Sequence, residues 1–458
     1  MGRLNLNNLR KTISYLKRNG LRETLITIRE HLAENRPQMP WGTYEYAPLE
    51  ENELAQQRMH QWQEPVTISI VVPAYHTPEQ YYREMIDSVR NQTYPHWQLV
   101  IGDAGEGDLL EQIAASYQDK RISYHHLSCN RSIADNTNET LQWADGEYIA
   151  LLDHDDLLAP EALYEMAAAI ETGKQSGFIP QMLYSDEDKC DEDVKKFYEP
   201  NFKPDFNLDL LMTNNYICHL LVMEAKLMKQ LGFRADYDGA QDHDLVLRGG
   251  GLLWRKPGAI VHISKVLYHW RCHSASTAAN PESKLYAYEA GVKATRDFVN
   301  SQGWKATVSM TQHMGFSRTE YDPDILTQRR EVGAVGGRVL GKARRIKGGM
   351  MSETGQVQYL ELKDGYSGYL NRAILVQQAE ALDLRCIRLS ESCMELFQRV
   401  TGFAYRTDEK TGMYDWHSLP ADYDYAGMGL QLSRKIREEG YVLIWDPQMV
   451  CDLTENPA

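Results

Sequence analysis

The sequence predicts an α/β protein with a mostly parallel central sheet flanked by helices. Three apolar runs of strand length are typical of strands covered on both faces: 66–75 (VTISIVVPAY), 97–104 (WQLVIGDA) and 148–152 (YIALL). Helical patterns separate these runs, the first with Tyr82 and Met85 on one face. Because strand and helix alternate, we expect ligands to bind beyond the carboxyl ends of the strands.

Length and charge narrow the class of protein. A chain of 458 residues favours two or three units rather than one core. The formal net charge of −15 argues against nucleic acid as a partner, because phosphate contacts need clustered Lys and Arg.

Cysteine usage and hydropathy indicate the compartment. The seven cysteines are scattered and form no C-x-x-C pair, which fits neither a disulfide framework nor a zinc ribbon and favours a reducing environment. No run of about 18 apolar residues predicts a spanning helix, and the N-terminus lacks a signal-peptide core. We expect a cytoplasmic protein.

The N-terminal segment, residues 1–36, reads as a pair of basic amphipathic helices. Residues 1–32 hold seven basic side chains against two acidic ones, a local charge of +5. Two interpretations stay open: docking on the chain's own catalytic domain, which the pattern favours, or peripheral contact with an anionic membrane surface. The polar, non-periodic residues 37–65 read as a linker.

Acidic residues follow two of the predicted strands. Asp103 ends the strand over 97–104, and residues 153–156 (DHDD) follow the strand over 148–152. Hard oxygen ligands in such clusters suit Mg²⁺ or Mn²⁺ bridged to a diphosphate, since these ions bind one or two carboxylates and complete their shell with water and phosphate. The alternative is a solvated turn, and the position after a buried strand favours the metal.

Several motifs together resemble a known family. The segments ISIVVPAY, SVRNQTYPHWQLVIGDA, NETLQWADGEYIALLDHDD, LYSDEDK, NNYICHLLV, GAQDHDLVLR and VLYHWRCHSAST follow in the order typical of family 2 glycosyltransferases of the bacterial surface-polysaccharide kind. The resemblance spans residues 66–300. It implies a GT-A fold there and a nucleoside-diphosphate sugar as donor.

The resemblance also implies residues for nucleotide binding. Pro73 and Tyr75 lie in the first motif, Asp103 matches the first acid of the family's strand-end pair, and Arg271 is suited to phosphate oxygens. Ala104 stands where the second acid of that pair is expected, so the usual contact with the base is in question.

The metal ligands follow from the D-x-D motif of the family. Asp153 matches its first acid, which contacts the nucleotide and the metal, and Asp155 matches the second, which ligates the cation. A further ligand is expected from His269 or His273, and the sequence does not choose between them.

Asp242 in GAQDHDLVLR matches the acid that serves as catalytic base. A positioned carboxylate that removes the proton of an acceptor hydroxyl lowers the barrier. The alternative is that Asp242 and Asp244 are acids favoured by a helix start. The acidic stretch 183–197 (LYSDEDKCDEDVKKF) reads as a solvated loop near the acceptor.

Residues 301–319 read as a second linker, and residues 320–458 as a smaller, degenerate transferase-like α/β domain. The stretch 423–447 resembles a worn copy of the sequence around Asp242, with Gly427 and Gly429 where the acids stand. We expect a truncated second module without a nucleotide-binding half, used for packing, acceptor binding or homodimer contacts.

The leading hypothesis is an inverting, metal-dependent glycosyltransferase that moves a sugar to a growing polysaccharide, glycan or lipid-linked glycan. One alternative is a non-catalytic scaffold that binds glycan or nucleotide. The other is a sugar nucleotidyltransferase, which would need a Gly-rich basic loop after the first strand, and PAYHTPEQ is not one.

Overall fold

The computed structural model describes residues 15–16, 19–21, 23–30, 44–272, 285–420 and 422–454. The chain divides into two compact units. The larger unit is Thr43–Phe298, and the second unit combines Met1–Gly42 with Val299–Ala458. Each unit is described by itself.

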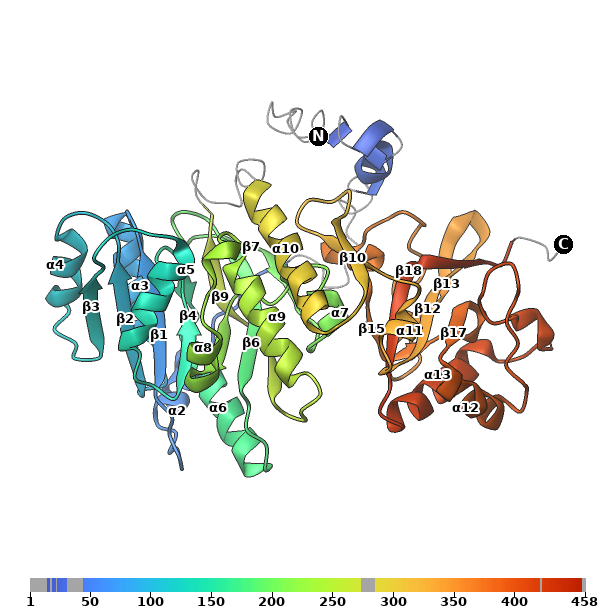
Figure 1. The fold of residues 1–458 in the computed structure, drawn as a ribbon. Coiled ribbons are helices and arrows are strands. Elements are labelled where there is room, and N and C mark those ends of the chain that lie inside the picture. The colour runs from blue at the N-terminus through green and yellow to red at the C-terminus, as the bar shows by residue number, and fades with distance from the viewer. Residues whose placement is uncertain are drawn as a thin grey trace. The chain divides into compact units, whose positions relative to one another are not determined.

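The larger unit is built on one mixed sheet in the order β3-β2-β1-β4-β8-β6-β9-β5, with β7 paired to β6 (Figure 1). The first four strands are parallel, as predicted; β8 is antiparallel to both β4 and β6, and β9 is parallel to β6. The strands are β1 (Ile68–Ala74), β2 (Trp97–Asp103), β3 (Ile122–His126), β4 (Tyr148–Leu151), β5 (Leu157–Leu158), β6 (Met182–Cys190), β7 (Phe197–Asn201), β8 (Leu221–Glu224) and β9 (Ile260–Arg271).

Helices cover both faces of this sheet. In β1, Ile70 and Val72 pack in one cluster with residues of α3 and α6, whereas the equally buried Val71 points to the other face, which α5 covers. The strand is therefore apolar at successive positions. The helices are α2 (Glu51–Arg58), α3 (Glu79–Arg90), α4 (Leu109–Ser116), α5 (Ile133–Thr140), α6 (Ala162–Gln175), α7 (Leu208–Leu211), α8 (Ala225–Leu231), α9 (Gln241–Leu253) and α10 (Leu285–Ser301).

Three stretches depart from the sequence reading. Residues 301–319, predicted as a linker, contain strand β10 (Ala306–Met310) and the start of β11 (Ser317–Tyr321). Within residues 37–65, α2 forms and buries Leu54, and Trp62 packs against the core of the larger unit. The prediction of a solvated loop over 183–197 is wrong for its first half, because β6 is buried along nearly its whole length. Its acids are buried because bases from distant parts of the chain pair with them, as with Asp186 and His262.

The second unit holds a smaller sheet that repeats the pairing of β6. Strand β12 pairs with β13 and β17 antiparallel and with β18 parallel, as β6 pairs with β7, β8 and β9. Helices α12 and α13 take the places of α8 and α9 in chain order. The similarity between residues 423–447 and the sequence around Asp242 therefore reflects a repeated topology. The strands are β10 (Ala306–Met310), β11 (Ser317–Tyr321), β12 (Val332–Gly341), β13 (Arg345–Gly348), β14 (Met350–Met351), β15 (Gln377–Ala379), β16 (Ala381–Leu382), β17 (Ile387–Leu389) and β18 (Val442–Asp452), and the α-helices α11 (Ile325–Gln328), α12 (Glu391–Thr401) and α13 (Tyr425–Glu438).

The edge of β17 is covered by the unit's own chain. In the larger unit β8 pairs with β4 on this side, but here the Tyr414 N–H donates to the carbonyl of Ile387 at 2.8 Å. The Tyr414 ring is buried against Tyr405 and Phe397, at centroid distances of 5.2 and 4.7 Å. The segment 405–414, here called the edge cover, therefore lies beside β17 at the place that β4 takes beside β8 in the larger unit.

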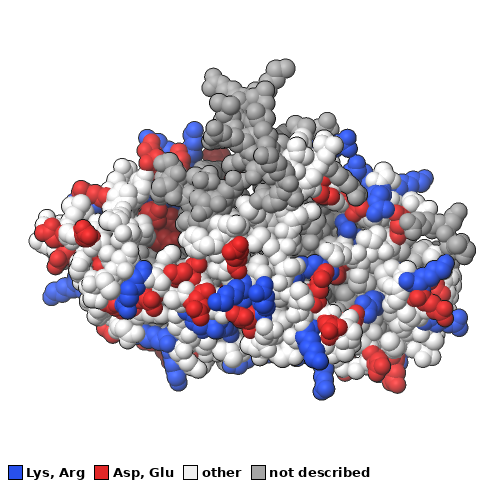
Figure 2. All heavy atoms as spheres, turned by 45° about the horizontal axis from the view of Figure 1, so that its top comes forward, with Lys and Arg blue, Asp and Glu red and all other residues white. Residues whose placement is uncertain are grey.

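Charged side chains of both signs are mixed on one face of the molecule (Figure 2). On the face in Figure 2, Lys and Arg are interspersed with Asp and Glu rather than gathered into one basic area. Within the described part of the chain, no helix has the length and apolarity needed to cross a bilayer.

Candidate functional site

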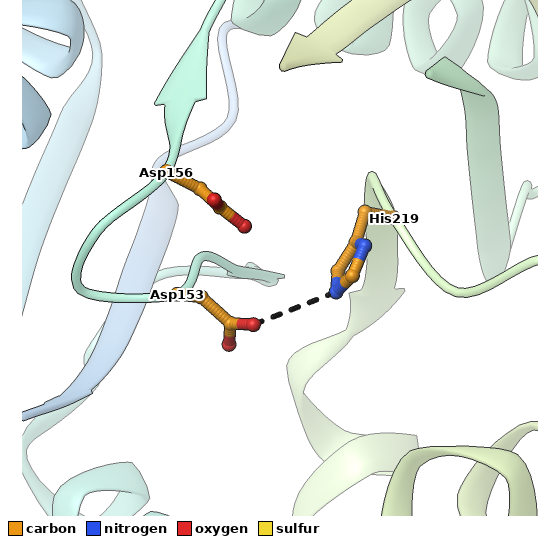
Figure 3. A group of neighbouring side chains, drawn as sticks. All are labelled: Asp153, Asp156 and His219. Atoms are coloured by element: carbon orange, nitrogen blue, oxygen red, sulfur yellow. Dashed lines mark ion pairs between the residues drawn. The ribbon is translucent and has the colours of Figure 1, made fainter. Parts of the chain in front are cut away.

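Three side chains at the carboxyl end of β4 form a group able to hold a metal ion. Asp153, Asp156 and His219 each offer one ligand atom, and these atoms lie within 4.8 Å of one another. Figure 3 shows the two carboxylates on one loop and the imidazole facing them from another segment. Asp153 Oδ2 and His219 Nε2 lie 3.6 Å apart.

Strand pairing explains why residues so far apart in sequence meet here. Asp153 comes just after β4, and His219 comes just before β8. The two strands are antiparallel neighbours, with Ala150 opposite Val222, so the end of one meets the start of the other. The His219 ring also stacks on the Tyr268 ring, with centroids 4.5 Å apart and planes within 10°.

Asp156 is the buried member of the group. Its Oδ2 accepts a hydrogen bond from the Tyr268 hydroxyl at 2.6 Å, and its Oδ1 accepts one from the Arg271 backbone N–H at 2.7 Å. Burial raises the pKa of Asp156 well above its ordinary value, and the charges of Asp153 and Asp155 raise it further. A divalent cation would relieve this repulsion, so the donor set fits Mg²⁺ or Mn²⁺.

A buried pair, Glu187 and Lys203, holds His219 from behind. Glu187 Oε2 accepts the backbone N–H of His219 at 3.2 Å and lies 3.4 Å from Nδ1 of the same residue. Lys203, whose side chain is fully buried, donates to the carbonyls of Ile217 (2.6 Å) and His219.

The surroundings of Glu187 and His219 favour the charged form of both side chains. Burial alone would raise the pKa of Glu187, but Lys203 and His219 outweigh it and lower the pKa to about 2. Burial likewise opposes protonation of His219, and contacts with Cys218, Asp153 and Glu187 overcome it, so the pKa of His219 lies well above 6.5.

Asp242 lies beside the same segment, in the first turn of α9. Its Oδ2 accepts a hydrogen bond from Asn215 Nδ2 at 2.7 Å and lies 3.8 Å from Cys218 Sγ. The next acid of the motif differs: Asp244 is buried and ion-paired to Arg234 and Arg248. Of the two acids, Asp242 alone contacts the chain segment that ends in His219.

Asp103 ends β2 beside β1, as the sequence predicted, but its carboxylate is buried. Oδ2 accepts from the Tyr124 hydroxyl at 2.8 Å, and Oδ1 accepts from the Gly105 backbone N–H at 2.7 Å. At the end of β1, Pro73 is half-buried and Tyr75 is 45% exposed. The carboxyl ends of β1, β2 and β4 thus share one edge of the sheet.

His269 lies away from the metal group. Its Nδ1 lies 2.6 Å from Asp188 Oδ1, and its ring packs against Tyr46 and Phe197 at centroid distances of 4.5 and 4.6 Å. His273 falls outside the described residues.

Arg271 is buried within the loops that carry the site. Its Nε donates to the Asp155 carbonyl at 2.7 Å and its Nη1 to the Glu192 carbonyl at 2.6 Å, and its Nη2 is ion-paired to Glu84 at 2.6 Å. The Asp155 side chain is not part of the three-residue group, and its Oδ1 lies 3.9 Å from His154 Nδ1.

Sequence reasoning missed His219 and Glu187 as members of the site, and it placed Asp156 in the acidic cluster 153–156 without naming it as a ligand. His219 stands in NNYICHLLV immediately before an apolar run, which was a usable signal for a strand-start residue. The burial of Glu187 could not be predicted, because an acidic stretch of sequence indicates a solvated loop as long as its distant partners are unknown.

Comparison with known proteins decides the family of the larger unit. The family described as glycosyl transferase family 2 matches residues 69–232, from β1 to the end of α8. This chain carries a family 2 glycosyltransferase domain. The match contains Asp103, Asp153 and His219, and it ends before Asp242.

Two relatives each match about half of this chain. The uncharacterized protein y4gI of Sinorhizobium fredii is 40% identical over 236 residues, which are 50% of this chain and 25% of that protein. The O-antigen biosynthesis protein RfbC of Myxococcus xanthus is 35% identical over 246 residues, 53% of this chain and 19% of that protein. The matched part therefore spans a quarter or less of each relative's length.

A solved structure, S. aureus TarS 1-349 in complex with UDP, has 18% identity and a TM-score of 0.38 to the chain, covering 50% of this chain and 65% of that one. The fold of the family 2 domain rests on the strand order described above and on the family match.

Proposed function

We propose that the family 2 domain is an inverting, metal-dependent glycosyltransferase. It moves a sugar from a nucleoside diphosphate to a hydroxyl of a growing surface polysaccharide or lipid-linked glycan. The observation that supports this best is the convergence on one segment: within residues 215–219, Asn215 contacts Asp242 and His219 contacts Asp153. A candidate base and a candidate metal group thus share one scaffold.

Different residues are proposed to bind the metal ion and the nucleotide. Asp153, Asp156 and His219 would hold Mg²⁺ or Mn²⁺, and Asp155 remains a candidate for a further ligand. When bound, the cation would neutralise charge on the departing diphosphate. Pro73, Tyr75 and Asp103 line the strand ends where the nucleotide is expected.

Asp242 is the proposed base. Its carboxylate takes the proton of the acceptor hydroxyl as that oxygen bonds to the anomeric carbon, and the bond to the diphosphate breaks on the opposite face. The proton ends on Asp242, and the products are the extended glycan and a nucleoside diphosphate. Asn215 holds the carboxylate by its Oδ2, at 2.7 Å.

The similarity to RfbC, an O-antigen biosynthesis protein, supports a surface glycan as the acceptor class. A cytoplasmic location follows from cysteine usage as an inference. We assign the repeat in the second unit to packing, acceptor binding or homodimer contacts through residues 320–458.

A screen of UDP-, GDP- and dTDP-sugars for metal-dependent hydrolysis tests the proposal. Release of one nucleoside diphosphate, abolished by EDTA and by Asp242→Asn, would support it. Nucleotide binding without turnover on any donor or glycan would favour the scaffold instead. Release of pyrophosphate from a nucleoside triphosphate would favour a nucleotidyltransferase.

A further inference from the structure

The N-terminal helical segment, described at residues 19–21 and 23–30, contacts the rest of its unit through a side that carries the charged Glu30 and the apolar Ile26. The Glu30 side chain is buried, and its carboxylate accepts hydrogen bonds from the Ser367 hydroxyl at 2.9 Å and the Gly368 N–H at 2.8 Å. On the same side of the helix, Ile26 lies close to Gly365. This side is occupied by the protein itself.

The opposite side of the segment exposes an apolar stripe. Leu21, Leu25 and Ile28 are spaced four and three residues apart, so they share one face of the helix, and they are 66%, 43% and 39% exposed. A helix face that meets water should be polar, whereas this one is apolar. The stripe is therefore arranged to be covered by something apolar.

The charge of the segment indicates what kind of surface covers the apolar stripe. Residues 1–32 contain seven basic and two acidic side chains, in a chain whose net charge is −15. Both acids lie toward the docked side: Glu30 is buried there, and Glu23 Oε2 is 3.4 Å from Gln312 Nε2. The described basic residue Arg29 is exposed. An apolar stripe in a positively charged segment matches the surface of an anionic bilayer.

We infer that the N-terminal helical segment lies on an anionic lipid surface, with Leu21, Leu25 and Ile28 inserted among the acyl chains and the docked side fixed to the second unit. A second copy of this chain fits less well, because a twofold contact through the stripe would bring two positive segments together. This inference goes beyond the proposed function and does not depend on it.

Co-sedimentation of the full chain with phosphatidylcholine vesicles, with and without phosphatidylglycerol, tests the inference. We expect binding to the vesicles that contain phosphatidylglycerol, weakened by salt. The variant Leu21→Gln, Leu25→Gln, Ile28→Gln should bind roughly tenfold or more weakly, since it loses the inserted apolar area. Leu360→Gln is the matched control, because Leu360 is also exposed (55%) and belongs to the same unit.

Three outcomes would overturn the inference. The first is no vesicle binding by a chain that still binds UDP with Mn²⁺, a result that leaves the proposed function intact. The second is equal binding of the triple variant or equal binding without phosphatidylglycerol. The third is a dimer in light scattering that the triple variant abolishes, which would make the stripe a contact between copies. Unchanged melting of the triple variant verifies that it folds.

Discussion

The carboxylate of Glu187 accepts the backbone N–H of His219 and lies 3.4 Å from the Nδ1 of the same residue. One buried side chain thus fixes both the backbone and the ring of a proposed ligand, and leaves Nε2 toward Asp153. Such supports orient metal-binding histidines.

Glu187→Gln should therefore lower Mn²⁺ affinity by ~10- to 100-fold, because the ring loses its negatively charged support. Calorimetric titration with Mn²⁺ in the presence of UDP measures this. Glu199→Gln, at an acid that is 67% exposed and pairs with Lys189, is the control and should change little. Equal affinity of the Glu187 variant and the native chain would limit Glu187 to a structural role.

Asp153→Ala should remove most Mn²⁺ binding without lowering the melting temperature, because the side chain is 57% exposed and its loss relieves repulsion with Asp156. His219→Ala should have a similar effect on binding, whereas Asp155→Asn should have a smaller one. Titration of the three variants with Mn²⁺ checks this order. A larger loss in the Asp155 variant would shift the ligand set toward the D-x-D pair.

Asp242→Asn should reduce turnover by ~10² to 10⁴ while leaving donor binding intact, since the amide keeps the shape of the carboxylate but cannot take the proton. Initial rates and donor titrations on the same preparation separate the two effects. If donor affinity falls as far as turnover, Asp242 binds the donor instead. Asp193→Asn, at an exposed acid, is the control.

His243 should make stability depend on pH. Burial lowers its pKa below the ordinary 6.5, and its Nε2–H donates to the Leu211 carbonyl at 2.8 Å. As pH falls, the unfolded chain therefore binds a proton at His243 before the folded chain does. The stability contributed by neutral His243 is thus fully present above pH 6.5 and is lost as pH falls through the pKa of the folded state. In melting curves from neutral to mildly acidic pH, His243→Gln should lose stability less steeply than the native chain. Parallel curves would contradict this.

Tyr414→Ala should open the edge cover of β17. Removing a buried aromatic ring costs ~3 to 5 kcal/mol, here concentrated where Tyr414 packs on Tyr405 and Phe397. Hydrogen exchange of peptides from β17 and β12 should rise, with that of the larger unit unchanged. Phe403→Ala, at a ring 40% exposed, should have a small effect. Unchanged exchange in β17 would mean that the edge is protected by something else.

The local hydrophobic pattern was enough to predict strands β1, β2 and β4 of the larger unit. The strands around Ile70, Val100 and Ile149 are buried on both faces, and the sequence shows this as uninterrupted apolar runs. The positions of Asp103 and Asp153 at strand ends then follow from parallel order. Glu187 could not be found in this way, because its burial depends on Lys203 and on a strand that returns much later in the chain.

The edge cover also bears on how such chains can be assembled. In the second unit, Gly429 aligns with Asp244 of the larger unit, and an added Cβ there would meet the Leu382 carbonyl oxygen at 2.3 Å. Because the edge cover hydrogen-bonds to β17 and buries Tyr414 there, this edge is not free to pair with a strand of another chain. A strand edge covered in this way is protected from the edge-to-edge pairing between chains that leads to aggregation.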